Sequence, residues 1–169
     1  MAKWGKCDFK QFEKLQNKLQ QLEKIDRDKF CQDMIKELAA RLLAKVIKRT
    51  PVGEYEPSSG VLGGTLRRGW TAQSEREAEL TAVFGGGNSV KSYVDSIQVT
   101  KTGDMYQIEI INPVHYASYV EYGHRTRDHK GWVEGRFMLT ISEQELDAQA
   151  PAILERKLEK ILGGLFNGE

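Results

Sequence analysis

The stretch that decides the fold spans residues 112–124 and reads Asn112-Pro113-Val114-His115-Tyr116-Ala117-Ser118-Tyr119-Val120-Glu121-Tyr122-Gly123-His124. It follows an alternating run from Met105 to Ile111, which predicts a strand that the Asn-Pro pair ends. A compact two-turn helix is predicted next, closed at Gly123 because glycine readily adopts the left-handed conformation that terminates helices.

Three tyrosines, Tyr116, Tyr119 and Tyr122, recur at helical spacing within this short element. A helix of this length is not stable alone, so its tyrosines must pack against something. A buried tyrosine hydroxyl needs a hydrogen-bond partner, which suits the residue to the boundary between two surfaces. The pattern indicates a docking element rather than a catalytic one.

Two helices are predicted upstream. Apolar residues spaced by three or four from Phe9 to Lys24 predict an amphipathic helix with a narrow apolar stripe. A broader apolar band predicts a second helix that begins near Asp26 or Asp28. It ends before Pro51, because the residue preceding proline avoids the helical region.

Residues 51–70 differ in composition, with two prolines and five glycines. Such a segment predicts a long loop, of the kind that is usually functional or disordered. At its end, residues 65–70 are compatible with either a helical turn or the start of a strand.

The following residues favour β structure. Strands are predicted over 79–84, 93–100 and 105–111, the last two joined by a turn at 101–104. After the tyrosine element, residues 124–135 predict a polar loop. Ser142 and Glu145 have capping-box spacing and predict the start of a final helix, kinked or split at Pro151 and ended by Gly163-Gly164.

This order predicts a single α+β domain over residues 1–169, in which the short tyrosine-rich helix and the C-terminal helix pack on a small antiparallel sheet. Residues 1–27 are expected to form a peripheral N-terminal helix, residues 28–163 the core, and residues 164–169 a tail. No apolar run approaches the roughly 20 residues that span a bilayer, and no secretory signal is visible, so no membrane association is expected.

The net charge of +1 conceals an asymmetry. Residues 1–50 contain 13 basic and 7 acidic residues, whereas residues 51–169 contain 12 and 17. A basic helical arm on an acidic body is compatible with nucleic acid, with another subunit's acidic face, or with an ordinary solvated helix surface.

Residues with catalytic or metal-binding chemistry form no recognised motif. His124, His129 and Asp128 share a polar loop, yet no zinc-type spacing accompanies them. Ser118 lies three residues from His115 without a nucleophile-elbow sequence. We therefore expect no catalytic residue, no metal and no cofactor, and rank a hydrolase last among the alternatives.

Two further clusters have residue types that are enriched in protein interfaces. The first surrounds an arginine pair in the glycine-rich segment, and the second follows the polar loop. Together with the tyrosine element they give the predicted subunit or partner interface: Arg67, Arg68, Trp70, Tyr116, Tyr119, Glu121, Tyr122, Trp132 and Arg136.

The combination of motifs resembles the tail-completion or neck proteins of tailed bacteriophages over roughly residues 28–160. The shared features are a basic helix entering Thr50-Pro51-Val52, the segment Gly64-Thr65-Leu66-Arg67-Arg68-Gly69, Asn112 with residues 116–123, and Gly135-Arg136-Phe137-Met138-Leu139. This chain departs from the pattern by a longer insert over residues 54–61.

The resemblance implies a non-enzymatic virion protein, assembled in the bacterial cytoplasm, that forms a ring of six copies in the neck. Its implied partners are copies of itself, head-closure or connector proteins, and tail-tube or tail-terminator proteins. DNA passes through the ring without specific binding, so we expect a neutral or acidic lumen, with the basic helices facing outward or toward acidic partners. A tail terminator that caps the tail tube is the alternative within this class.

A DNA-binding module is the alternative from a different class. It would use the basic residues of the two N-terminal helices: Lys10, Lys14, Lys18, Arg41, Lys45, Lys48 and Arg49. No helix-turn-helix or zinc-finger pattern accompanies them.

Overall fold

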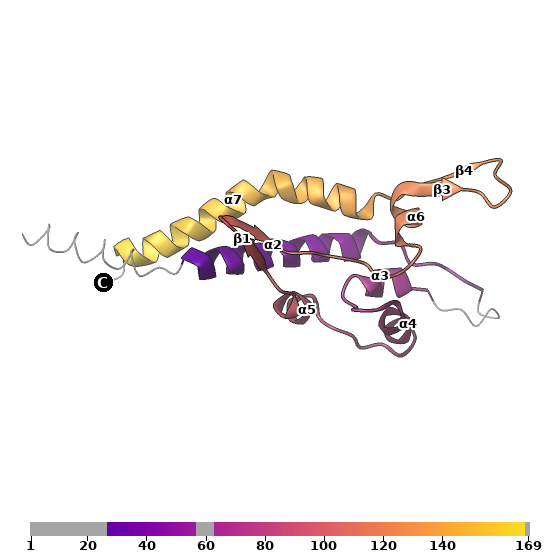
Figure 1. The fold of residues 1–169 in the computed structure, drawn as a ribbon, viewed down its shortest axis with the longest axis horizontal. Coiled ribbons are helices and arrows are strands. Elements are labelled where there is room, and N and C mark those ends of the chain that lie inside the picture. Colours follow the sequence, from indigo (N-terminus) through magenta and orange to yellow (C-terminus); the bar gives the residue numbers. More distant parts are fainter. Residues whose placement is uncertain (1–26, 57–62, 168–169) are drawn as a thin grey trace, which may run out of the picture.

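The computed structural model describes residues 27–56 and 63–167. The predicted helix over residues 9–24 lies outside this range. Two long helices dominate, α2 (Arg27–Arg49) and α7 (Met138–Asn167), and they lie side by side in opposite directions (Figure 1). The second predicted helix is thereby confirmed close to its predicted bounds.

Four short helices and two hairpins complete the described fold. The helices are α3 (Thr65–Gly69), α4 (Glu75–Phe84), α5 (Val90–Ser96) and α6 (Ala117–Tyr122). One hairpin pairs β1 (Thr100–Thr102) with β2 (Met105–Gln107), and the other pairs β3 (Gly123–Arg125) with β4 (Trp132–Glu134). The α+β class is confirmed.

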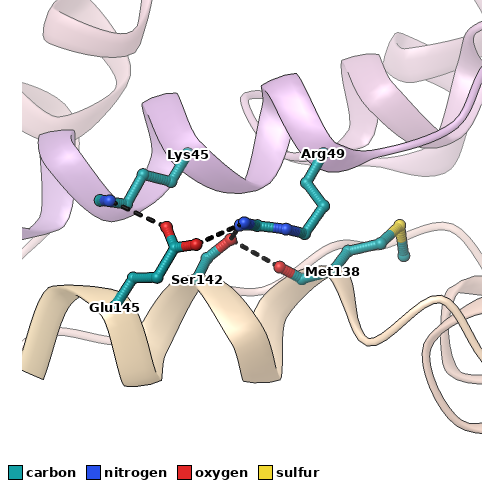
Figure 2. Close-up of polar contacts among 5 residues, drawn as sticks. All are labelled: Lys45, Arg49, Met138, Ser142 and Glu145. Carbon is teal, nitrogen blue, oxygen red and sulfur yellow. Dashed lines mark hydrogen bonds and ion pairs between the residues drawn. The ribbon is translucent and has the colours of Figure 1, made fainter.

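The C-terminal helix packs along α2, and not on a sheet as the sequence had indicated. Polar contacts between the two helices include Glu145, which accepts from Lys45 at 3.0 Å and from Arg49 at 2.7 Å (Figure 2). Arg49 also donates to the hydroxyl of Ser142 at 2.8 Å, and that hydroxyl donates to the carbonyl of Met138 at 2.6 Å. These contacts fix the register of the pair.

The predicted bounds of the last helix were wrong at both ends. It begins at Met138, so Ser142 is buried in its second turn rather than capping it. It continues through Pro151, whose missing N–H leaves one carbonyl without its helical donor, and Figure 1 shows a bent helix. Gly163 and Gly164 do not end it.

The hydrophobic core lies where the C-terminal half of α2 meets α3, α5 and the first residue of α7. Leu43, Val46 and Met138 are fully buried there, and Trp70 is 4% exposed. Burial of such side chains stabilises a fold by about 1.5–3 kcal/mol each, so this end of the molecule anchors the rest.

The predicted strand over residues 79–84 was wrong, because the segment belongs to helix α4. Ser74 is its N-cap and accepts from the backbone N–H of Glu77 at 3.2 Å. The Glu77 carboxylate in turn accepts from the backbone N–H of Gln73 at 2.9 Å. This reciprocal capping satisfies amides that a helix leaves without partners at its start.

The predicted strand over residues 93–100 was also mostly wrong. Ser89 caps α5 by accepting from the N–H of Ser92 at 3.1 Å, so Tyr93 and Val94 are helical. The predicted hairpin after it is confirmed but is short, with Thr102 opposite Met105. Its Lys101 and Tyr106 both donate to Asp28, which ties the hairpin to the start of α2.

Candidate subunit interface

The tyrosine element forms α6, and a hairpin follows it directly where the sequence predicted a polar loop. Hairpin β3–β4 projects beyond the helix pair at one end of the molecule (Figure 1). Gly123 joins α6 to β3 with φ of +86°, a value that side chains disfavour. A Cβ at Gly123 would lie 2.5 Å from the carbonyl oxygen of Val133, and one at Gly135 would lie 2.3 Å from that of Glu121. Both glycines are required for the hairpin to close against α6.

Glu121, near the end of α6, is buried against the start of α7, with 6% of its area exposed. Its carboxylate accepts from the backbone N–H groups of Leu139 and Thr140, both at 2.9 Å, and from the Thr140 hydroxyl at 2.8 Å. These are first-turn amides of α7, where a negative charge is also favoured by the helix dipole. Glu121 therefore holds the start of α7 against α6.

The three tyrosines occupy different environments. Tyr116 is half-buried and packs on the core, and burial, aided by Tyr55, raises the pKa of its phenol. Tyr119 and Tyr122 are 56% and 61% exposed. Tyr119 lies beside the ring of His124, with the ring centroids 5.7 Å apart. Two of the three predicted contact tyrosines are therefore available on the surface of the subunit.

The hairpin presents different residues on its two faces. Trp132 stands opposite Arg125, and Val133 opposite His124, in the antiparallel register. Directly opposite residues share a face of a sheet. Trp132 is 56% exposed, and Arg136 is exposed just after the hairpin, where its backbone N–H donates to Val120 at 2.8 Å.

The arginine segment, residues 64–70, makes most of its contacts within the subunit. Trp70 is in the core, and its indole N–H donates to the hydroxyl of Thr50 at 2.7 Å. Arg67 donates twice to the carbonyl of Thr50, at 3.1 and 2.6 Å, and so caps the end of α2. Only Arg68 is exposed. The buried Trp70 and Glu121 thus take no part in the exposed surface, contrary to the sequence-based assignment.

Asn112 connects the two motif regions. Its amide donates to the carbonyl of Leu66 at 2.9 Å, and its oxygen accepts from the N–H of Val114 at 3.2 Å. A Cβ at Gly69 would lie 2.2 Å from that oxygen, so a residue without a side chain is required there. The arginine segment and the stretch that begins at Asn112 are therefore packed together, and we call this contact the junction.

A groove of about 510 Å³ lies beside this junction, between the Pro51–Tyr55 loop and α6. Its lining includes Tyr116, Val120 and Arg136 together with Gly63, Gly64 and Leu66. It brings together two of the predicted interface residues, Tyr116 and Arg136.

Other exposed apolar residues were not among those predicted for the interface. On the same end of the molecule these are Val133, Phe137 and Ile141, and on α4 they are Leu80, Val83 and Phe84. Phe137 has φ of +48°, uncommon for an aromatic residue. The three α4 residues have i, i+3, i+4 spacing, which is the sequence signal for one face of a helix.

The last group comprises the residues considered for catalysis, metal binding or DNA binding. His115 pairs with the carboxylate of Glu75 and makes an edge contact with the ring of Tyr116, and Ser118 is exposed on α6. Within residues 27–56 and 63–167, no three metal-ligating side chains gather. Of the described basic residues in the DNA-binding alternative, Arg41 pairs with Glu37, and Lys45 and Arg49 pair with Glu145, leaving Lys48 exposed.

The packed junction thus holds exposed aromatic and basic residues at one end of a small α+β body. Residues 13–123 match the protein family described as "Bacteriophage HK97-gp10, putative tail-component". The match spans more than half of the chain, and the chain belongs to this family of phage tail components. No curated protein and no solved structure matches the chain.

The family match covers some of the motifs described above and not others. It begins earlier than the resemblance drawn from the sequence, which started near residue 28, and it ends at Gly123. The arginine segment, Asn112 and α6 therefore lie within it. Hairpin partner β4 and helix α7, including the Phe137 segment, lie beyond it.

Proposed function

We propose that this chain is a structural subunit of the neck of a phage or phage-like particle. Copies of it form a ring of six that joins the tail to the head connector. Family membership supports a tail component of the virion. The ring, its position and its partners are our proposal.

The observation that carries the proposal is the exposed aromatic end of the subunit. Tyr119, Tyr122 and Trp132 are each more than half exposed, although their backbones are fixed by α6 and the hairpin. Exposed aromatic residues on a fixed backbone are typical anchors of protein interfaces, because little conformational entropy is lost when they are covered. Arg136 adds a guanidinium group that suits acidic partners.

The proposed partners are ones that this surface would suit in a tail component. Each subunit would meet copies of itself in the ring, a head-closure or connector protein on one side, and a tail-tube or terminator protein on the other. DNA would pass through the lumen without specific contacts. The role requires no bond chemistry and no cofactor, so we propose a non-enzymatic protein assembled in the host cytoplasm. No helix in the described ranges is both long and apolar enough to cross a membrane.

The decisive experiment is electron microscopy of particles made without this chain. A neck role predicts filled heads and separate tails of normal length, and added purified protein should restore joining. Tails of uncontrolled length would instead indicate the terminator role. Normal joined virions would refute both roles.

A second measurement tests self-association directly. Light scattering on the full-length protein should show a concentration-dependent oligomer, or a ring once a neck partner is added. A chain that stays monomeric alone and with connector or tail-tube proteins would contradict the ring. Retention on duplex DNA at physiological salt would favour the DNA-binding alternative.

A further inference from the structure

We infer that neighbouring copies meet head to tail, with hairpin β3–β4 of one copy seated on the apolar face of α4 of the next. The inference rests on the proposed function, which requires copies in a ring, and it names the two surfaces that meet. Both surfaces are on this chain, and neither has a partner within the described residues.

The first surface, the α4 face, is formed by Leu80, Val83 and Phe84. They are 48%, 50% and 80% exposed and recur at i, i+3 and i+4, so they share one side of the helix. The buried residue of α4 is Ala78, at 0% exposure, which packs into the core. The helix is therefore anchored through one side while its bulky apolar side chains face solvent.

The second surface, the hairpin face, is formed by Trp132 and Arg125. They stand directly opposite each other in the strand pair, and both are exposed. Tryptophan and arginine are both among the residue types enriched at the positions that dominate interface energies. The α4 face supplies the apolar area that such a tryptophan requires.

The two segments have opposite net charges. Residues 123–136 contain Arg125, Arg127, Lys130 and Arg136 against Asp128 and Glu134, a net charge of +2 without the histidines. Residues 75–84 contain three glutamates and Arg76, a net charge of −2. Complementary charge favours this pairing over contact between two identical surfaces, which would place like charges together.

One charge pair is well placed to meet across the contact. Glu79 is exposed and lies beside Val83 on the helix surface, four residues away. The other α4 glutamates already have partners, since Glu75 pairs with His115, and Glu77 accepts from Gln73 and Asn88. Arg125 and Glu79 are thus the charges that we expect to approach each other.

The placement of the two surfaces suits a ring. The hairpin projects beyond one end of the α2–α7 pair, and α4 lies beside α2 near that same end (Figure 1). A contact between two different surfaces leaves one of each unused, so it propagates until rotation closes it. A self-complementary contact would stop at a dimer.

The test uses two full-length variants, each impaired in one surface. Trp132→Ala with Arg125→Glu impairs the hairpin face, and Leu80→Ala with Phe84→Ala impairs the α4 face. Each alone should weaken self-association by at least about 30-fold, the scale of an interface hot spot. Mixed together, they should form a one-to-one heterodimer that grows no further, because only one competent contact remains.

A charge exchange gives a second readout. Arg125→Glu alone should weaken association, and adding Glu79→Arg in the same chain should restore it to within about threefold of the unmodified protein, since the pair is then reversed. Matched controls are Arg156→Glu and Leu158→Ala, exposed positions on α7. They should leave association unchanged.

The outcomes separate the inference from the proposed function. Oligomers that are unaffected by these variants, or variants that fail to complement each other, would overturn the inference while leaving the ring in place. Absence of any self-association in the unmodified protein, with or without neck partners, would overturn both. Loss of duplex binding in Arg125→Glu without any change in association would assign the hairpin to nucleic acid and overturn the inference.

Discussion

The carboxylate of Glu121, at the end of α6, caps Leu139 in the first turn of α7 through a hydrogen bond of 2.9 Å. The two residues are 18 positions apart, and the intervening chain forms the projecting hairpin. Because a second bond reaches the N–H of Thr140, one buried side chain fixes the base of the hairpin and the start of the 30-residue helix together.

We therefore expect Glu121→Ala to lower the free energy of unfolding by about 2 kcal/mol, since it removes a charged cap from part-buried amides. Glu121→Gln should cost less, because its amide oxygen still accepts one bond. Chemical denaturation monitored by circular dichroism measures both. Glu143→Ala, at an exposed position of the same helix, is the control and should change stability by less than about 0.5 kcal/mol. Equal effects of the alanine variants would contradict the cap.

Gly69 supplies a second prediction, because a Cβ there would meet the side-chain oxygen of Asn112 at 2.2 Å. Gly69→Ala should destabilise the protein by about 1–3 kcal/mol, the usual cost of forcing atoms into a packed site. Gly164→Ala offers a control of opposite sign. Its Cβ would meet nothing within 4 Å inside α7, so higher helix propensity should raise stability by up to about 1 kcal/mol. A neutral Gly69→Ala would show that the junction tolerates rearrangement.

The sequence was most informative where helix signals were strong and local. Helix α2 and the α6 element follow from their apolar spacing and from Pro51 and Gly123. Helix α4 was not predicted, although Ser74 and Glu77 have capping-box spacing, because the β-branched and aromatic residues near its end are typical of strands. Ser89 gave a similar local signal for α5.

Other features had no local signal at all. The cap of α7 comes from Glu121, on a different element, whereas the local Ser142 and Glu145 pattern serves the contact with α2. Likewise, Trp70 was grouped with interface residues by its type, but the hydroxyl of Thr50 provides its partner in the core. Such tertiary contacts decide which residues of one type are buried and which are exposed.

The contact between Glu145 and the two basic residues of α2 predicts a dependence on pH. Hydrogen bonds from Lys45 first, then from Arg49, lower the pKa of Glu145 below its ordinary value of 4.5. A group with a lowered folded-state pKa stabilises the fold fully above its unfolded pKa, and loses that contribution as the pH falls through the folded value. Glu145→Gln should therefore melt at a lower temperature than the unmodified protein at pH 7.

The difference in melting temperature between the two proteins should shrink as the pH falls below about 4.5, because the carboxylate of the unmodified protein then gains a proton. Thermal unfolding followed at several pH values provides the measurement. Glu155→Gln, an exposed position further along α7, serves as the control. A difference that persists unchanged at low pH would mean that Glu145 acts through packing and not through its charge.

Two tryptophans with opposite environments give the last prediction. Trp70 is 4% exposed and donates to Thr50, whereas Trp132 is 56% exposed on the hairpin. Trp70→Phe should cost about 1 kcal/mol or more, because it loses the hydrogen bond and leaves a gap in the core. Trp132→Ala should leave the stability of the isolated subunit within about 0.5 kcal/mol, since more than half of the residue is exposed. Denaturation of the monomer and light scattering on the same samples distinguish the two roles: Trp70→Phe that still folds should associate normally, and Trp132→Ala should fold normally but associate poorly. A Trp132→Ala variant that lost stability and kept its association would place this side chain in the architecture of the subunit rather than at its boundary.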